Sequence, residues 1–517
     1  MSNQPRTVDA HDVGRVPAIL WFALPIVLAW LMQLYAIWQP PYVPLVDLPN
    51  HMARFYLESL ALVREPLPQG YEIDYRILPN LGADLVMPLL MQAFDASAAC
   101  KLFLSGSALM YWLGPAIFLS QYQPRREASA LAAMLLLPWT LNTNLFWGFL
   151  NYYSGFGLAF AILGHYLWIE RTGRKTFLQL TFHALLVALL FLWHLAPWGI
   201  YCVIVGCHAA VALADSVGRG AARRAIASIA LTELAVIPSV VLFAFYLGEK
   251  SALNPETGFD WGSWSRKLGM PLTLFRTYDV RLDVLAFLMW ATAIVLGFRF
   301  REGNGWHRQW IWLAIAAFGL LYLLIPAQLG STSATDSRLL PAILVCAAAL
   351  MSRCSLARWK WALLLLVSSF ALHNLSVIRA WDGLSVNLSR EAEAIELLQA
   401  GSRVLPVSLV PHHSKEFPGF HFASWAVIDR HVYIPTLFAY SDQQPLKLTD
   451  RPPPTKESNG VTHVPDRIVA EGYRYIWLYN PANARVRIPP RYRRIFKSND
   501  LAVYELPGSG RFSSFGK

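Results

Sequence analysis

The segment Val43–Glu58 reads VPLVDLPNHMARFYLE and follows shortly after an apolar stretch at residues 16–38. Asp is a favoured N-cap and Pro is favoured at the first helical position, so Asp47 and Pro49 predict a helix that starts at Leu48 or Pro49. The helix would be amphipathic and too short to cross a bilayer. We therefore expect it to lie along a membrane surface.

His51, Arg54 and Glu58 share one face of this helix at spacings i, i+3 and i+7, and Asp47 stands at its N-terminal edge. A carboxylate held there could take a proton from an acceptor hydroxyl. His51 and Arg54 would be near enough to orient it or to meet a phosphate. The alternative is that Asp47 only caps the helix, and the spacing leaves both roles open.

The composition of the chain points to a membrane protein. Of 517 residues, 55% are hydrophobic and 15% are charged, whereas soluble domains carry about 25% charged residues. Residues 1–378 hold 46 charged side chains, while the 139 residues 379–517 hold 31. We predict a membrane domain over 1–378 and a water-facing domain over 379–517. The net charge of +11 comes with 20 Trp and few charges in total, which argues against a nucleic-acid partner.

About eleven stretches are apolar enough to be candidate membrane-spanning helices. They are residues 16–38, 99–121, 127–141, 152–169, 177–194, 197–214, 225–247, 283–299, 310–326, 338–352 and 359–378. Every second loop between them is basic, as the positive-inside rule requires of cytoplasmic loops. This pattern predicts a multi-pass protein with a cytoplasmic N-terminus. The loop 39–98 and the C-terminal domain would then lie on the outer face, which in a bacterium is the periplasmic side of the inner membrane.

The outer parts have their own predicted elements. Residues 83–94 of the loop 39–98 predict a second short surface helix. In the C-terminal domain, residues 389–400 predict a helix. The segments VLPVSLV, HVYIP, YRYIWLYN and LAVYELP predict strands, so we expect an α+β fold.

Two further polar residues lie at outer ends of predicted spans. His194, in LWHLAPWG, is either functional or hydrogen-bonded to a neighbouring helix. Arg338, in ATDSRLLP, could clamp a lipid-linked phosphate, or it could pair with Asp336 or anchor the helix at the interface. The five cysteines form no CxxC pair, which argues against a disulfide framework or a zinc site. Nucleotide-binding and hydrolase motifs are also absent from the sequence.

The strings VDLPNHMAR, LPNLGADLVMPLL and WGFLNYYSG resemble those of poorly characterised bacterial members of the GT-C class. These are membrane-integral glycosyltransferases that use polyprenyl-phosphate-linked sugars, and the layout of loop, spans and outer domain is similar to theirs over the whole chain. The resemblance implies transfer of a hexose or pentose to a glycan, lipid or protein acceptor at the outer membrane face.

The resemblance also implies roles for particular residues. Asp47 would be the general base or an acidic metal-site residue, and Arg338 would match the basic residue that holds the donor phosphate. The sequence departs from the family in one respect, because the acidic residue that many members pair with this Asp is replaced by Leu48. Asp84 and Glu58 are the candidates for a second carboxylate. The need for a divalent cation stays open.

Two other functions compete with this one. A flippase or transporter of lipid-linked sugars predicts internal repeats or polar groups at mid-bilayer, and the predicted spans are almost free of charge. A non-catalytic envelope assembly protein would not need a carboxylate-rich first loop.

Overall fold

The structure is a computed structural model that describes residues 18–508 with gaps. The gaps are 123–125, 219–231, 254–257, 300–308, 330–331, 352–359, 411–413, 451–454 and 459. Arg6, Arg15 and many of the other loop residues on which the predicted orientation rests lie outside the described residues. The orientation of the chain in the membrane therefore stays a prediction.

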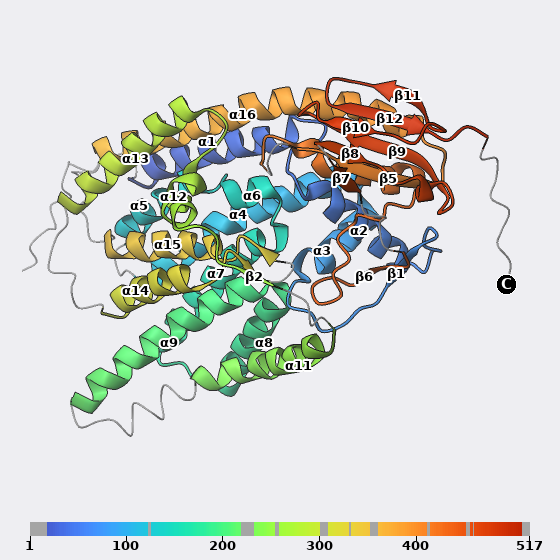
Figure 1. The fold of residues 1–517 in the computed structure, drawn as a ribbon. Coiled ribbons are helices and arrows are strands. Elements are labelled where there is room, and N and C mark those ends of the chain that lie inside the picture. The colour runs from blue at the N-terminus through green and yellow to red at the C-terminus, as the bar shows by residue number, and fades with distance from the viewer. Residues whose placement is uncertain are drawn as a thin grey trace, which may run out of the picture.

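Long helices make up most of the molecule (Figure 1). They are α1 Ala18–Trp38, α4 Ala96–Tyr122, α7 Leu150–Thr172, α8 Phe177–Trp193, α9 Leu195–Gly218, α11 Ile237–Leu253, α13 Val280–Arg299, α14 Gln309–Leu324, α15 Leu340–Met351 and α16 Lys360–Glu396. In the described part of the chain, α4, α9 and α16 are long and apolar enough to cross a membrane, and several others are apolar but shorter. The chain is an integral membrane protein, and the number of crossings stays a prediction.

Helices α4 and α7 pack closely because two glycines remove side chains from their crossing. A Cβ atom on Gly114 of α4 would collide with the carbonyl of Gly157 in α7, and a Cβ on Gly157 would collide with the Met110 carbonyl. The predicted span at 127–141 is not one continuous helix. It consists of the nine-residue helix α5 (Arg126–Met134) followed by the 3-10 turn η1 (Leu137–Trp139).

Short elements connect the long helices at one end of the bundle. The segment after α1 forms α2 (Leu48–Leu62), β1 (Tyr71–Ile73) and α3 (Gly82–Ala93), so both predicted surface helices are present. Further along the chain are α6 (Thr143–Trp147), α12 (Trp264–Phe275) and η4 (Ser337–Leu339). The strands β2 (Phe259–Asp260), β3 (Gln328–Leu329) and β4 (Thr332–Ser333) form a small sheet beside them. The 3-10 turn η2 (Leu234–Val236) lies instead near the other end of α7, where Thr232 donates to Glu170 at 2.5 Å.

The C-terminal part is built on a four-stranded sheet in the order β11-β12-β9-β5. Its strands are β5 Arg403–Ser408, β9 Tyr473–Tyr479, β11 Arg493–Lys497 and β12 Leu501–Glu505. Three of them match predicted strands, whereas HVYIP forms only one isolated bridge, from Tyr433 to Arg403. A second sheet contains β7 Lys456–Ser458, β8 Val461–His463 and β10 Arg485–Arg487, and η7 spans Asp466–Ile468. Helix α16 runs unbroken across residue 378, so the predicted domain boundary falls inside one helix.

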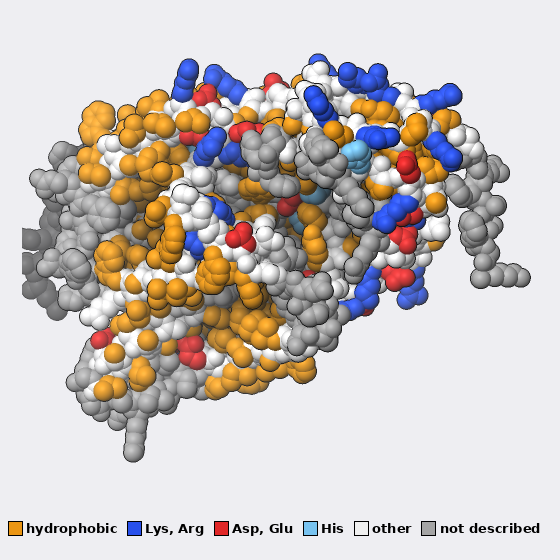
Figure 2. Space-filling view, in the orientation of Figure 1, with side chains coloured by type: hydrophobic (Ala, Val, Ile, Leu, Met, Phe, Trp, Pro, Cys, Tyr) orange, Lys and Arg blue, Asp and Glu red, His pale blue; other side chains and the backbone are white. Residues whose placement is uncertain are grey.

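The C-terminal part lies directly against the segment that follows α1. Strand β6 (Leu446–Leu448) pairs antiparallel with β1, and η6 (Pro418–Ser424) and α17 (Trp425–Arg430) pack on α2. Charged side chains gather over the end that carries the strands, while apolar side chains cover much of the helical end (Figure 2). Both chain segments contribute to the wall of the cavity described below.

Candidate functional site

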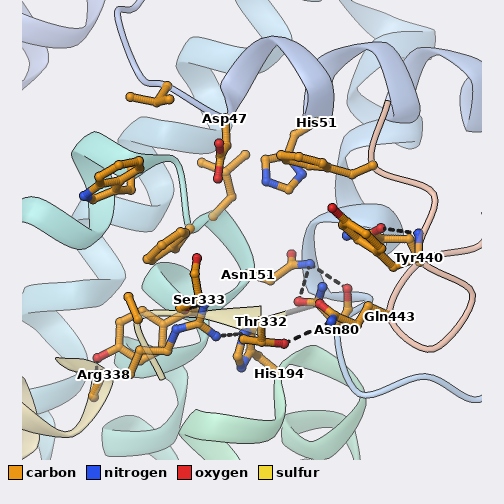
Figure 3. Close-up of a pocket in the computed structure, with 18 of the residues that line it drawn as sticks. Asp47, His51, Asn80, Asn151, His194, Thr332, Ser333, Arg338, Tyr440 and Gln443 are labelled. Atoms are coloured by element: carbon orange, nitrogen blue, oxygen red, sulfur yellow. Dashed lines mark hydrogen bonds between the residues drawn. The ribbon is translucent and has the colours of Figure 1, made fainter. Parts of the chain in front are cut away.

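A cavity of about 520 Å³ lies where α2, the α6–α7 turn, the start of α9, the β3–β4 region and the C-terminal segment meet. Asp47 and His51 lie on one side of it, and Arg338 and His194 lie on the facing side (Figure 3). Other lining residues include Asn80, Trp147, Phe149, Asn151, Tyr152, Arg266, Ser333, His421, Phe438, Tyr440, Gln443 and Gln444. Four of the residues singled out from the sequence thus share one cavity.

Asp47 occupies the N-cap position of α2, but its carboxylate makes no hydrogen bond to the helix. The backbone fixes it instead, because the Asp47 amide donates to the Trp147 carbonyl at 3.0 Å. Gly148 follows Trp147 in a left-handed conformation, with φ +89°, and packs against the Asp47 backbone and Cβ. Asp47 therefore stands at the N-cap position without capping the helix through its side chain. The side chain, 18% exposed, stays available to the cavity.

The surroundings of Asp47 favour its neutral form more than water does. Burial raises the pKa of the Asp47 carboxyl to about 7, and the positive charge of Arg338 offsets only part of this. Burial, together with the charge of Arg54, holds the pKa of His51 well below its usual value. A carboxyl group with a pKa near neutrality is suited to accept a proton and release it again.

Arg338, on the opposite wall, is held by groups without formal charge. It stacks on Phe149, with its guanidinium carbon 4.7 Å from the ring centre, and donates to the Ser333 carbonyl at 3.2 Å. His194 Nε2 lies 3.2 Å from Arg338 Nη1. The predicted alternative, a salt bridge to Asp336, is wrong. Asp336 pairs with Arg266 at 2.8 Å and with Lys267 at 3.5 Å.

Arg54, Glu58 and Asp84 form a separate buried cluster. Arg54 Nε lies 2.7 Å from Asp84 and 3.5 Å from Glu58, and all three side chains are excluded from solvent. Burial and the Asp84 carboxylate raise the pKa of Glu58 well above its usual value. The cluster does not line the cavity but lies behind its wall, where Asn151 donates to Asp84 at 3.4 Å. Arg54 therefore pairs with these two carboxylates and does not line the cavity, where it was expected to orient Asp47 or meet a phosphate.

The donor set around Asp47 does not fit a divalent cation. His421, which could ligate a metal, has its Nε2 3.7 Å from Asp47 Oδ1. The other two candidate carboxylates, Glu58 and Asp84, face Arg54 instead. Within the described residues no group of three His, Cys, Asp or Glu side chains is placed to hold a metal.

Several lining residues were not found from the sequence. His421, Phe438, Tyr440, Gln443 and Gln444 all come from the C-terminal segment. Gln443 donates to the Thr332 hydroxyl at 2.9 Å and so connects this segment to β4 (Figure 3). Asn80 and Asn151 lie in two of the strings that carry the resemblance, LPNLGADLVMPLL and WGFLNYYSG. The C-terminal residues have no local signal except an isolated His in an aromatic run, GFHFASW.

The sequence matches no family model and no curated protein. The fold, however, is similar to that of ArnT from Cupriavidus metallidurans. The crystal structure of ArnT bound to undecaprenyl phosphate superposes with a TM-score of 0.56 at 10% identity, over 95% of this chain and 99% of ArnT. The apo structure gives 0.53 at 10% identity, over 94% and 98%. ArnT has the GT-C fold, so the fold implied by the resemblance in the sequence is confirmed.

Proposed function

We propose that this protein is a glycosyltransferase that moves a sugar from a polyprenyl-phosphate carrier to an acceptor hydroxyl. One observation carries the proposal. A carboxylate with a pKa of about 7 and a buried guanidinium face each other across one cavity. The ArnT fold adds support, because ArnT was crystallised with undecaprenyl phosphate. At 10% identity that likeness establishes the fold, and the activity proposed here rests on the residues of this chain.

The reaction uses the two walls of the cavity in different ways. The acceptor O–H gives its proton to Asp47, and the oxygen forms a bond to the anomeric carbon of the donor sugar. The bond from that carbon to the phosphate oxygen breaks, and its electron pair leaves with the polyprenyl phosphate. Attack from the face opposite the phosphate inverts the anomeric configuration. Arg338 stabilises the negative charge that collects on the phosphate.

The Arg338 wall has spare capacity for an anion. Arg338 Nε is buried and has no hydrogen-bond partner among the described residues. The His194 ring faces two donors, because the Ala196 amide donates to Nδ1 at 3.0 Å and Arg338 lies beside Nε2. A neutral imidazole has only one acceptor nitrogen, so Nε2 also presents N–H. A phosphate oxygen between these donors would accept from both.

The space between the two walls suits a hydroxyl-rich sugar. Asn80, Asn151, Gln443 and Gln444 bring amide groups to the cavity, and Trp147 and Tyr440 bring ring faces. Amides exchange hydrogen bonds with sugar hydroxyls, and aromatic rings cover the apolar faces of a sugar. We expect the chain to act in a bacterial inner membrane, with the cavity and the C-terminal domain on the periplasmic face. The acceptor would be a glycan, lipid or protein.

The test is the substitution Asp47→Asn in the full-length protein. Polyprenyl-linked sugars are extracted from the producing membranes and supplied as donor, and release of polyprenyl phosphate is followed by mass spectrometry. We expect a rate loss of about 10²- to 10⁴-fold. Glu72→Gln, an exposed carboxylate on β1, is the matched control and should keep full activity. Unchanged release by Asp47→Asn would refute the proposal. Altered sidedness of the lipid-linked sugar without any release would favour a flippase.

A further inference from the structure

A histidine of the C-terminal segment reaches the proposed base. His421 lies on η6, and its Nε2 is 3.7 Å from Asp47 Oδ1. Two aromatic rings hold the imidazole edge-to-face: Phe420, with centroids 4.5 Å apart, and Phe438, with centroids 5.1 Å apart. The side chain is only 15% exposed. The ring therefore has little freedom to turn away from the carboxylate.

The buried side chain of Asn50 determines which nitrogen of His421 carries a proton. The Asn50 Nδ2 atom lies 3.3 Å from the Thr436 carbonyl oxygen, and the Ser424 hydroxyl donates to Asn50 Oδ1 at 2.5 Å. A carbonyl oxygen can only accept, so the atom facing Thr436 must be the amide nitrogen. Asn50 is fully buried, and these partners fix the direction of its amide group.

The same amide nitrogen lies 3.1 Å from His421 Nδ1. Because Asn50 donates there, Nδ1 must be the acceptor nitrogen of the ring. The proton of the neutral imidazole then sits on Nε2, the atom that faces Asp47. A doubly protonated ring would set an N–H of His421 against an N–H of Asn50. The contact with Asn50 therefore favours the neutral ring with Nε2–H as a donor to Asp47, and it disfavours a role for His421 as a proton acceptor.

We propose that His421 is a positioning residue, held by Asn50 as the Nε2–H tautomer, which donates to one oxygen of Asp47 and aims the other at the acceptor hydroxyl. This inference rests on the proposed function. At 3.7 Å the contact is longer than a hydrogen bond, and catalytic hydrogen bonds commonly tighten only when substrate is bound. The C-terminal domain thereby supplies part of the catalytic arrangement.

Three variants of the full-length protein test the role of the ring, assayed by polyprenyl phosphate release from extracted donor. His421→Phe removes the donor, and we expect kcat to fall about 10²-fold with little change in the donor KM. His421→Gln keeps an N–H group at the end of the side chain and should recover part of that loss. His463→Gln on β8, away from the cavity, is the matched control and should behave as wild type. Thermal unfolding of each variant separates lost catalysis from lost folding.

Asn50→Asp tests the tautomer itself. An Asp at position 50 accepts a hydrogen bond from Nδ1–H and so favours the Nδ1–H tautomer, in which Nε2 carries hydrogen only while the ring is doubly protonated. We expect this variant to lose activity at alkaline pH, where the wild type is on a plateau. An Asn50→Asp profile identical to that of the wild type would overturn the inference, as would full kcat in His421→Phe. If either result were found while Asp47→Asn is inactive, the inference about His421 would fail and the proposed function would stand. A fully active Asp47→Asn would refute the function first.

Discussion

Gly148 packs against Asp47, and a Cβ atom added to Gly148 would lie 3.1 Å from both the Cβ and the backbone nitrogen of Asp47. That distance is tighter than ordinary van der Waals contact. The left-handed turn after α6 therefore brings its backbone close against the residue before α2. A side chain at position 148 would be strained by the left-handed backbone and would require Asp47 to shift by a few tenths of an ångström. The position of the proposed base is thus set by a turn from a distant part of the chain.

The substitution Gly148→Ala should lower activity more than it lowers stability. The added methyl group would push Asp47 away from its present position, and the left-handed backbone adds a strain of about 1 kcal/mol. Gly173→Ala is a matched control, because Gly173 also ends a helix in a left-handed conformation but has open space around its Cβ position. We expect both variants to unfold at slightly lower temperatures. Only Gly148→Ala should lose polyprenyl phosphate release, and equal activity in both would contradict this assignment.

Activity should rise with pH up to about 7 and then level off. Asp47 is a base only when it is deprotonated, and burial raises its pKa to about 7. Rates of release measured from pH 5 to 9, with donor saturating, check this. A rate that stays constant down to pH 5 would contradict the assignment of Asp47, with its raised pKa, as the base.

The same carboxyl group should also make stability depend on pH. An unfolded Asp titrates near ~3.9, so between pH ~4 and ~7 the folded chain binds more protons than the unfolded chain. The contribution of Asp47 to the free energy of unfolding therefore falls as the pH rises through this range. Asp47→Asn removes that dependence, and its unfolding temperature should exceed that of the wild type at pH 8. The difference should shrink as the pH is lowered toward 4.

Arg338 should govern the affinity for the lipid phosphate. Loss of a charge-assisted hydrogen bond to phosphate costs about 1.5–3 kcal/mol, so Arg338→Gln should weaken binding of undecaprenyl phosphate by about 10- to 100-fold. Arg338→Lys keeps the charge without the planar stacking on Phe149 and should be intermediate. Binding to detergent-solubilised protein can be followed by the shift in unfolding temperature. Arg493→Gln, on the exposed strand β11, serves as the control, and a similar loss there would argue against a specific site.

The Arg54 cluster should matter for folding. Removing one partner of a buried ion pair leaves an uncompensated charge, so Asp84→Ala should lower the free energy of unfolding by about 3–5 kcal/mol. Asp74→Ala, which removes a partly exposed carboxylate paired with Arg76 and Lys447, should lower stability far less. Thermal unfolding of the two variants gives the comparison. A stable Asp84→Ala protein with no activity would instead mark Asp84 as a second catalytic carboxylate.

Local signals were enough to place Asp47, because an Asp and a Pro before an amphipathic run define where a helix begins. They could not say which neighbours on that helix face the cavity. His51 and Arg54 share a face by spacing, yet His51 lines the cavity while Arg54 lies against Asp84 on α3. The rotation of α2 is set by its packing on α3, η6 and α17, which come from elsewhere in the chain.

The cavity-lining residues of the C-terminal segment could not be predicted either, because their position also depends on packing between distant parts of the chain. Nothing near His421 indicates that the residue will meet Asp47, because their contact depends on the pairing of β1 with β6 and on the packing of η6 against α2. The sequence predicts a water-facing domain over residues 379–517. It could not show that residues of this segment complete a wall of the cavity.

The pairing of β1 with β6 has a consequence for how the protein is made. Ribosomes deliver Asp47 to the membrane early, whereas His421 and Gln443 emerge only after most of the chain has been translated. An unfinished or truncated polypeptide therefore exposes its carboxylate without the walls that exclude water. Until that segment has been made, the cavity lacks the part of its wall that His421 and Gln443 contribute.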